Sequence, residues 1–194
     1  MSKLAVVQGH PDASGDHLCD ALAQAYVDGA KSAGHQVEFF DLGQLDFPFL
    51  RTQKDWEKGI LGTPETLKAA QSALIEANHI VLVYPLWLGT MPAVLKGFLE
   101  QVFRPGVALS DDEGFPKPLL KGKSARVVIT MGMPALIYRF YFFAHGLRNL
   151  ERSILGVAGI RPIRSTLFGS VESVSPQQRA GWIEKMKRLG KAAR

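Results

Sequence analysis

Three loops of this chain carry side chains that could bind or transform a small molecule. The first contains His10, His17 and Cys19, the second exposes Trp87, and the third leads into Tyr138. Imidazole and phenol groups can transfer protons or stabilise charge, and an indole ring offers a flat apolar wall. No Ser-His-Asp set and no convincing carboxylate pair competes with them, so these loops are the predicted functional site.

Each of these loops follows an apolar run with the length of a buried strand. The runs are residues 3–8, 80–83 and 125–130, and further strands are predicted at 36–40 and 162–169. Because helices separate the strands, we expect a doubly wound α/β fold, a parallel sheet in the order 2-1-3-4-5 with helices on both faces. In that order strands 1 and 3 flank the point where the strand order reverses. The three loops would then gather around one crevice.

Composition predicts one domain over residues 1–194, and the single cysteine fits a reducing cytoplasm. No apolar stretch reaches the roughly 20 residues that a membrane span needs. The net charge of +5 is concentrated in residues 179–194, which carry six basic residues and one acid. Since the remainder of the chain is neutral, a nucleic-acid surface is not expected. We expect a terminal amphipathic helix with Trp182, Met186 and Leu189 on one face.

The first loop is predicted to bind a phosphate. It lies between the first strand and a helix that runs as far as Gly34, with Asp16 as the expected N-cap residue. The free backbone N–H groups and the dipole of a helix N-terminus favour an anion. The sequence therefore places a phosphate site beside His10.

The second loop carries the most specific pattern of the chain. After the strand come Pro85 and an apolar, glycine-containing loop, and Pro92 suits the start of the next helix. The stretch reads Pro-Leu-Trp-Leu-Gly-Thr-Met-Pro-Ala-Val-Leu-Lys-Gly, followed by Val-Phe at 102–103. It closely resembles the flavin-contacting segment of the NAD(P)H:quinone oxidoreductases. The resemblance implies a flavodoxin-like fold and a flavin site.

The resemblance extends to the other two loops. Gly-His-Pro in the first loop resembles the family's phosphate-contacting loop, with His17, Leu18 and Cys19 at the positions where Ser-Phe-Asn is usual. The third loop resembles the family's Thr-Thr-Gly-Gly loop, followed by a pocket tyrosine and a histidine, here Tyr138 and His145. The cofactor-binding residues that it implies are His10, His17, Leu18, Cys19, Pro85, Leu86, Trp87, Leu88, Gly89, Thr130, Met131, Gly132 and Tyr138.

The resemblance also implies a reaction, which is two-electron transfer from NAD(P)H through a bound flavin to a quinone. Leu86, Trp87, Leu88 and Gly89 would position the ring, while Tyr138 and His145 would stabilise negative charge or protonate the reduced quinone. The sequence does not distinguish FAD from FMN as the bound flavin, or NADH from NADPH as the electron donor. A homodimer is expected, because family pockets are completed by a second subunit.

Two alternatives belong to other functional classes. A flavodoxin-type electron carrier would share the fold, although its phosphate loop and its acidic surface are absent here. An ancillary subunit of a membrane transport system could use the basic tail or the aromatic segment 135–148 to contact its partner. Asp111 and Asp112 have no third ligand at a useful spacing, so we expect a solvated turn and no metal.

Overall fold

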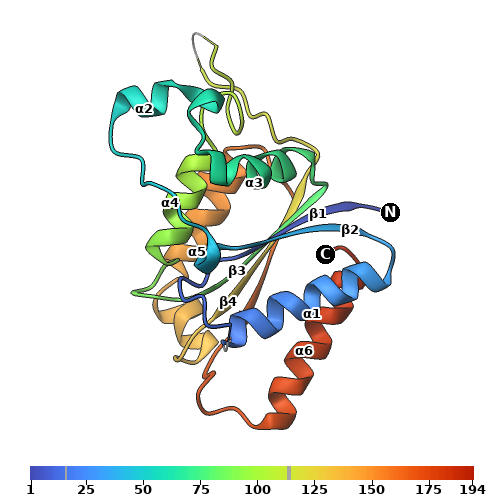
Figure 1. Cartoon of the computed structure of the whole chain (residues 1–194). Helices are drawn as coiled ribbons and strands as arrows, with labels where there is room; N and C mark the ends of the chain where they lie inside the picture. The colour runs from blue at the N-terminus through green and yellow to red at the C-terminus, as the bar shows by residue number, and fades with distance from the viewer. Residues whose placement is uncertain (16, 113–114) are drawn as a thin grey trace.

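The computed structural model describes residues 1–15, 17–112 and 115–194 (Figure 1). One parallel sheet has the order β2-β1-β3-β4-β5, which confirms the predicted doubly wound fold. Its strands are β1 (Lys3–Gln8), β2 (Gln36–Asp41), β3 (His79–Pro85), β4 (Ser124–Thr130) and β5 (Ile163–Phe168). The α-helices are α1 (Leu18–Ser32), α2 (Gln53–Glu57), α3 (Glu65–Glu76), α4 (Ala93–Val102), α5 (His145–Asn149) and α6 (Pro176–Lys191).

The central strands are apolar because they are covered on both faces. Residues 80–83 of β3 and 125–129 of β4 are fully or almost fully buried, as expected for parallel strands between two helical layers. The register pairs Val6 with Val81 and Leu82 with Val127. Short helical segments at Leu42–Gln44, Gly59–Gly62, Ile137–Tyr141 and Leu150–Gly156 fill the connections.

Helices α1 and α6 cover one face of the sheet, and α3 and α4 cover the other (Figure 1). The crossing of α1 and α6 depends on two glycines. A Cβ atom added at Gly190 would stand 2.1 Å from the Tyr26 carbonyl oxygen, and one at Gly29 would stand 2.1 Å from that of Lys187. The two backbones can approach this closely only because neither position has a side chain.

The predicted apolar faces of two helices are confirmed. In α4 the apolar stripe is buried in the core with Leu95, Phe98 and Val102. In α6 Met186 is buried, and Trp182 packs beside it against the α1 side of the sheet. Among the basic residues of α6, Arg188 and Lys191 are exposed, whereas the ammonium group of Lys185 lies 5.5 Å from the centroid of the Phe168 ring.

The aromatic segment of residues 135–148 does not form one continuous helix. A helical turn over Ile137–Tyr141 is separated from α5 by Phe143 and Ala144, whose φ angles are +51° and +49°. The break lets Gly146 pack on the backbone of Gly89, where an added Cβ would stand 2.3 Å from the carbonyl oxygen. Packing against the second loop therefore overrides helix continuity.

The expected N-cap of α1, Asp16, lies outside the described residues, and His17 directly precedes the helix. No helix in the described ranges is both long and apolar enough to cross a membrane. Within those same ranges, no cluster of three or more His, Cys, Asp or Glu side chains is arranged to hold a metal.

Candidate functional site

A cavity opens where β1, β3 and β4 end, beside the first turn of α1. Its volume of about 390 Å³ falls within the range of about 300–1,000 Å³ usual for small-molecule sites. The lining residues are His10, His17, Leu18, Cys19, Pro85, Leu86, Trp87, Thr130, Met131, Gly132, Val171 and Glu172. All except Val171 and Glu172 are predicted cofactor-binding residues, so the three predicted loops do meet at one crevice.

Two stacked imidazoles form the polar end of the cavity. The rings of His10 and His17 lie 3.7 Å apart at an interplanar angle of 21°. His17 Nε2 lies 2.9 Å from Asp12 Oδ2, and His10 Nδ1 accepts a hydrogen bond of 3.2 Å from the backbone N–H of Asp12. Burial lowers the pKa of His10, and the adjacent His17 lowers it further.

The first turn of α1 supports this polar end. The carboxylate of Asp20 accepts hydrogen bonds from the His17 backbone N–H, at 2.9 Å, and from the Gln8 side-chain amide. The side-chain oxygen of Gln8 in turn accepts from the His10 backbone N–H. Because the first N–H groups of a helix have no partner within the helix, the N-terminus of α1 offers donors for an anion at the cavity.

Cys19 packs against the third loop rather than acting as a reactive thiol. Its sulfur lies 3.2 Å from Thr130 Oγ1, and the side chain is buried. Burial raises the pKa of Cys19 to about 12, so the thiol stays protonated at neutral pH. Its contribution is to join α1 to the end of β4.

The second loop forms the apolar end of the cavity. Trp87 is 47% exposed and meets His10 edge to face, with ring centroids 5.8 Å apart. The backbone N–H of Leu86 donates to the Thr130 carbonyl at 2.8 Å, which fixes this loop to β4. An exposed indole held on a fixed backbone is a surface on which a flat ring can stack.

A tight turn follows Trp87. Trp87 and Thr90 exchange backbone hydrogen bonds of 2.9 and 3.0 Å, so that Leu88 and Gly89 form the tip. Their φ angles are +48° and +82°, a conformation that glycine adopts freely and leucine adopts at a cost. The Leu88 side chain is fully exposed at this tip, and neither residue lines the cavity.

Tyr138 and His145 also lie outside the cavity lining. Tyr138 is buried, and its hydroxyl accepts from the Leu147 backbone N–H at 3.1 Å and donates to the Gly89 carbonyl at 3.4 Å. Burial raises the pKa of Tyr138. The side chain of His145 is exposed and lies 5.9 Å from the Phe143 ring. Tyr138 therefore connects the turn of the second loop to α5.

Sequence reasoning missed Val171 and Glu172, which follow β5. A Cβ at Gly132 would stand 3.8 Å from Glu172 Oε1, so this carboxylate lies over the third loop. The sequence Gly-Ser-Val-Glu carries no recognisable ligand motif. The available signal was positional, since residues that follow a parallel strand reach the same edge of the sheet as the three predicted loops.

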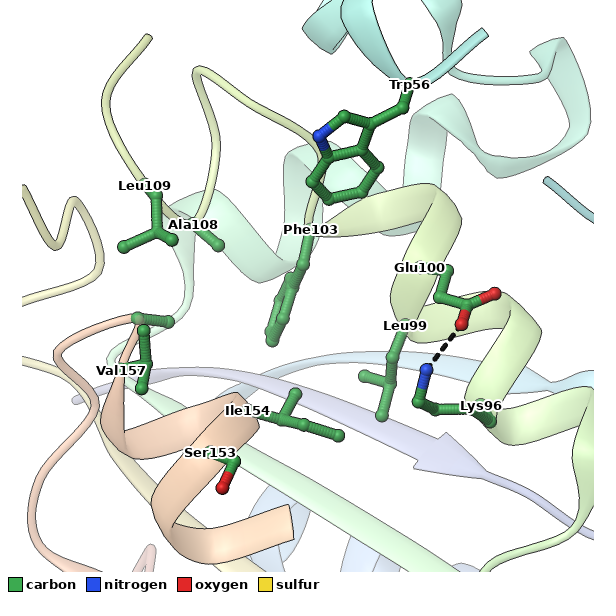
Figure 2. A pocket seen from close by; sticks show the side chains of 11 residues that line it. Trp56, Lys96, Leu99, Glu100, Phe103, Ala108, Leu109, Ser153, Ile154 and Val157 are labelled. Carbon is green, nitrogen blue, oxygen red and sulfur yellow. Dashed lines mark hydrogen bonds and ion pairs between the residues drawn. The ribbon is translucent and has the colours of Figure 1, made fainter. Parts of the chain in front are cut away.

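A second, smaller and mainly apolar cavity lies between α4 and the helical segment 150–156 (Figure 2). Its volume is about 170 Å³. Trp56 and Phe103 form one wall, Ile154 lies opposite, and an ion pair between Lys96 and Glu100 borders it. Lys96, the cation among its described lining residues, is already paired with Glu100, so we do not take this cavity as the cofactor site.

The first cavity suits the two ends of a flavin. An isoalloxazine ring needs a flat apolar wall, which Leu86 and Trp87 offer, and a phosphate needs donors, which the histidines and the start of α1 offer. The buried imidazole of His10 lines the cavity together with His17 and Glu172. The residues present therefore fit this cofactor.

Comparisons with known proteins agree with this arrangement. A family model described as a flavodoxin-like fold matches residues 2–189. A protein of Haemophilus influenzae described as an uncharacterized NAD(P)H oxidoreductase is 28% identical over 166 residues, covering 84% of this chain and 82% of the relative. An FMN-dependent NADH:quinone oxidoreductase of Ruegeria pomeroyi is 30% identical over 148 residues, covering 69% and 72% of the two chains.

A solved structure shares the fold across the whole chain. The NAD(P)H:quinone oxidoreductase from Methanothermobacter marburgensis superposes with a TM-score of 0.82 at 22% identity, covering 100% of this chain and 99% of that one. The chain therefore belongs to the flavodoxin-like family that includes the NAD(P)H:quinone oxidoreductases.

Proposed function

We propose that this chain is a flavin-dependent NAD(P)H oxidoreductase that passes two electrons from NAD(P)H to a quinone or a similar acceptor. The observation that carries the proposal is the cavity in which an anion-binding end, with His10 and His17, faces the apolar wall of Leu86 and Trp87. A flavin bound there supplies the hydride chemistry. The whole of residues 1–194 would act as one flavin-binding domain in the cytoplasm.

The chain's own contribution is binding and positioning. Trp87 would stack on the ring, and the hydrogen bond from Leu86 to Thr130 holds that wall at a fixed distance from β4. Tyr138 would position the turn through its contact with Gly89. The exposed imidazole of His145 stays our candidate proton donor for the reduced acceptor, because the next residue, Gly146, packs on that turn.

A homodimer is the assembly that we propose. Large apolar side chains are exposed along the broken aromatic segment, among them Phe140 at 67% and Phe143 at 54%, close in the chain to Tyr138. Exposed apolar surface of this kind marks an interaction site. Sedimentation equilibrium would give twice the chain mass, whereas a monomer at micromolar concentration would contradict this assembly.

The activity is tested first by absorbance spectroscopy of the purified protein with and without added flavin. FMN is the first flavin to test, because the relative from Ruegeria pomeroyi is named as FMN-dependent, and FAD is the second. The expected result is a bound flavin that bleaches on anaerobic addition of NADPH or NADH and recovers with a quinone. No flavin uptake would refute the proposal. Bleaching without recovery would refute the acceptor class.

A further inference from the structure

The second cavity, between α4 and the segment 150–156, reaches from the solvent into the core (Figure 2). The lining side chains of Leu99, Phe103 and Ala158 are buried, whereas those of Trp56 and Val157 are 38% and 49% exposed. Among the described residues, none lines both this cavity and the predicted cofactor cavity. A molecule bound here would therefore leave the cofactor site free.

The shape and the walls of this cavity suit a single aromatic ring. Trp56 comes from α2 and Phe103 directly follows α4, and Figure 2 shows Ile154 opposite them. Ile154 belongs to the π-helical segment Leu150–Gly156, and wide turns of this kind are rare and often found at functional sites. An engineered apolar cavity of about 150 Å³ stays dry and binds benzene. The volume here, about 170 Å³, is therefore enough for one ring with a small substituent.

The polar end of the cavity indicates what that substituent is. Among the described lining residues, Lys96 and Glu100 carry the charges, and an ion pair joins them. Because the pair is neutral as a whole, a charged ligand would have to displace one of the two partners. A hydroxyl group can donate to the carboxylate and accept from the ammonium group without separating them. This end of the cavity thus favours a neutral hydroxyl group over a carboxylate.

We propose that the second cavity is a binding site for a neutral single-ring phenol. The ring lies between the aromatic wall of Trp56 and Phe103 and the side chain of Ile154, and the hydroxyl group meets the pair of Lys96 and Glu100. Aromatic walls add to the burial energy of a ring through stacked or edge-to-face contacts. The site is additional to the proposed flavin site and does not depend on it.

The first test is isothermal titration calorimetry of the full chain with phenol and with benzoate, which has the same ring and a negative charge. Phenol should bind with a dissociation constant on the order of 1 mM or below, which is attainable for so small a ligand. Benzoate should bind at least about tenfold more weakly. Excess FMN should change the constant for phenol by less than about twofold. This comparison needs no variant, so it does not depend on whether a mutant folds.

The substitution E100Q tests the polar end. It removes the negative charge and leaves the ammonium group of Lys96 free for an anion, so benzoate should bind about tenfold more tightly than it binds the parent. Phenol should bind within a few-fold of the parent, because the amide oxygen still accepts a hydrogen bond. The matched control is E184Q, which removes the partner of Lys187 in an exposed ion pair on α6. E184Q should keep the parent preference for phenol.

The substitution I154F tests the location of the ring. Ile154 points into the cavity in Figure 2, so a phenylalanine there fills the space that the ligand needs. Phenol should then bind at least about tenfold more weakly. The matched control is I75F, because Ile75 is an exposed residue of α3 that does not line the cavity. I75F should bind phenol as the parent does.

Three results would overturn the inference. They are the absence of phenol binding at millimolar concentration, the displacement of phenol by FMN, and a preference for phenol over benzoate that E100Q leaves unchanged. Phenol binding that persists in I154F would place the ligand elsewhere and also overturn it. None of these results affects flavin binding, and a chain that takes up no flavin should still bind phenol, so the two proposals fail separately.

Discussion

Two histidines at opposite ends of the sheet show how differently its two edges use polar side chains. His10 follows the carboxyl end of β1 and opens onto the cavity beside a second imidazole. His79 begins β3 at the amino edge and is buried. Its Nδ1 atom forms a hydrogen bond of 2.7 Å with Ser124 Oγ. Its Nε2 atom has no hydrogen-bond partner among the residues that the structure describes.

The difference follows from what covers each edge. At the amino edge the C-terminal part of α6 packs directly on α1, and Arg126 bridges Thr166 and the backbone oxygen of Arg194. His79 and Arg126 are enclosed there and serve the packing. At the carboxyl edge the strands lead into loops with a cavity between them, and polar side chains such as that of His10 line this cavity. We therefore expect substitutions at the amino edge to change stability and those at the carboxyl edge to change binding.

The largest effect is expected at the contact of α6 with α1. G190A would force a Cβ to within 2.1 Å of the Tyr26 carbonyl oxygen, and we expect the free energy of unfolding to fall by about 3 kcal/mol. Urea denaturation measures this change. The matched control on the same helix is G181A, where an added Cβ meets no atom within 4 Å, and where helix propensity predicts a gain of up to about 1 kcal/mol. Equal effects of the two substitutions would contradict the packing argument.

The second effect is a loss of stability in acid. Burial, with Arg126 and Arg164 nearby, lowers the pKa of His79 to about 4 from 6.5. Between pH 6.5 and 4 the unfolded state binds the proton that the folded state excludes, so the free energy of unfolding falls as the pH falls, by about 3 kcal/mol in total. Urea denaturation between pH 7 and 4 measures this dependence.

The variant for this test is H79Q, which should lose that part of the pH dependence although it is less stable at pH 7. The control H35Q should keep it, since His35 is not fully buried. An H79Q protein whose stability falls with acid as steeply as the parent's would show that other groups are responsible.

At the carboxyl edge, W87A should weaken flavin binding and leave the fold intact. Trp87 is 47% exposed, so little core packing is lost. Losing an aromatic stacking partner costs about 1 kcal/mol, or roughly a fivefold to tenfold rise in the dissociation constant. Fluorescence titration measures the binding, and thermal unfolding serves as the control. An unchanged dissociation constant would place the ring elsewhere.

The smallest effect is expected for Y138F, which tests whether Tyr138 has a positioning role or a catalytic one. Y138F removes the hydroxyl that joins Gly89 to Leu147, and we expect a loss of stability of about 1 kcal/mol with a modest decrease in the rate of quinone reduction. Stopped-flow measurement of flavin reoxidation tests this rate. A decrease of several hundredfold at unchanged stability would instead make Tyr138 a proton donor.

The sequence was sufficient to predict those parts of the site whose structure depends on residues close together in the chain. Pro85, Trp87 and Pro92 mark the end of a strand, a loop and the start of a helix within a few residues, so the second loop and α4 could be predicted from neighbouring residues alone. His10 was found in the same way, from a strand followed by a polar loop and a helix, whereas Cys19 was assigned only from its position in the family resemblance. Glu172 was missed because its own neighbours carry no comparable pattern.

What the sequence determined by itself is the set of elements, their order in the sheet and the three loops at one edge, because strand periodicity and turn residues act over short distances. Tertiary structure decided the rest. Only the folded chain brings the rings of His10 and His17 together, breaks the aromatic helix where Gly146 meets Gly89, and buries Tyr138 away from the cavity. Those outcomes depend on contacts between segments far apart in the sequence, which local propensity does not encode.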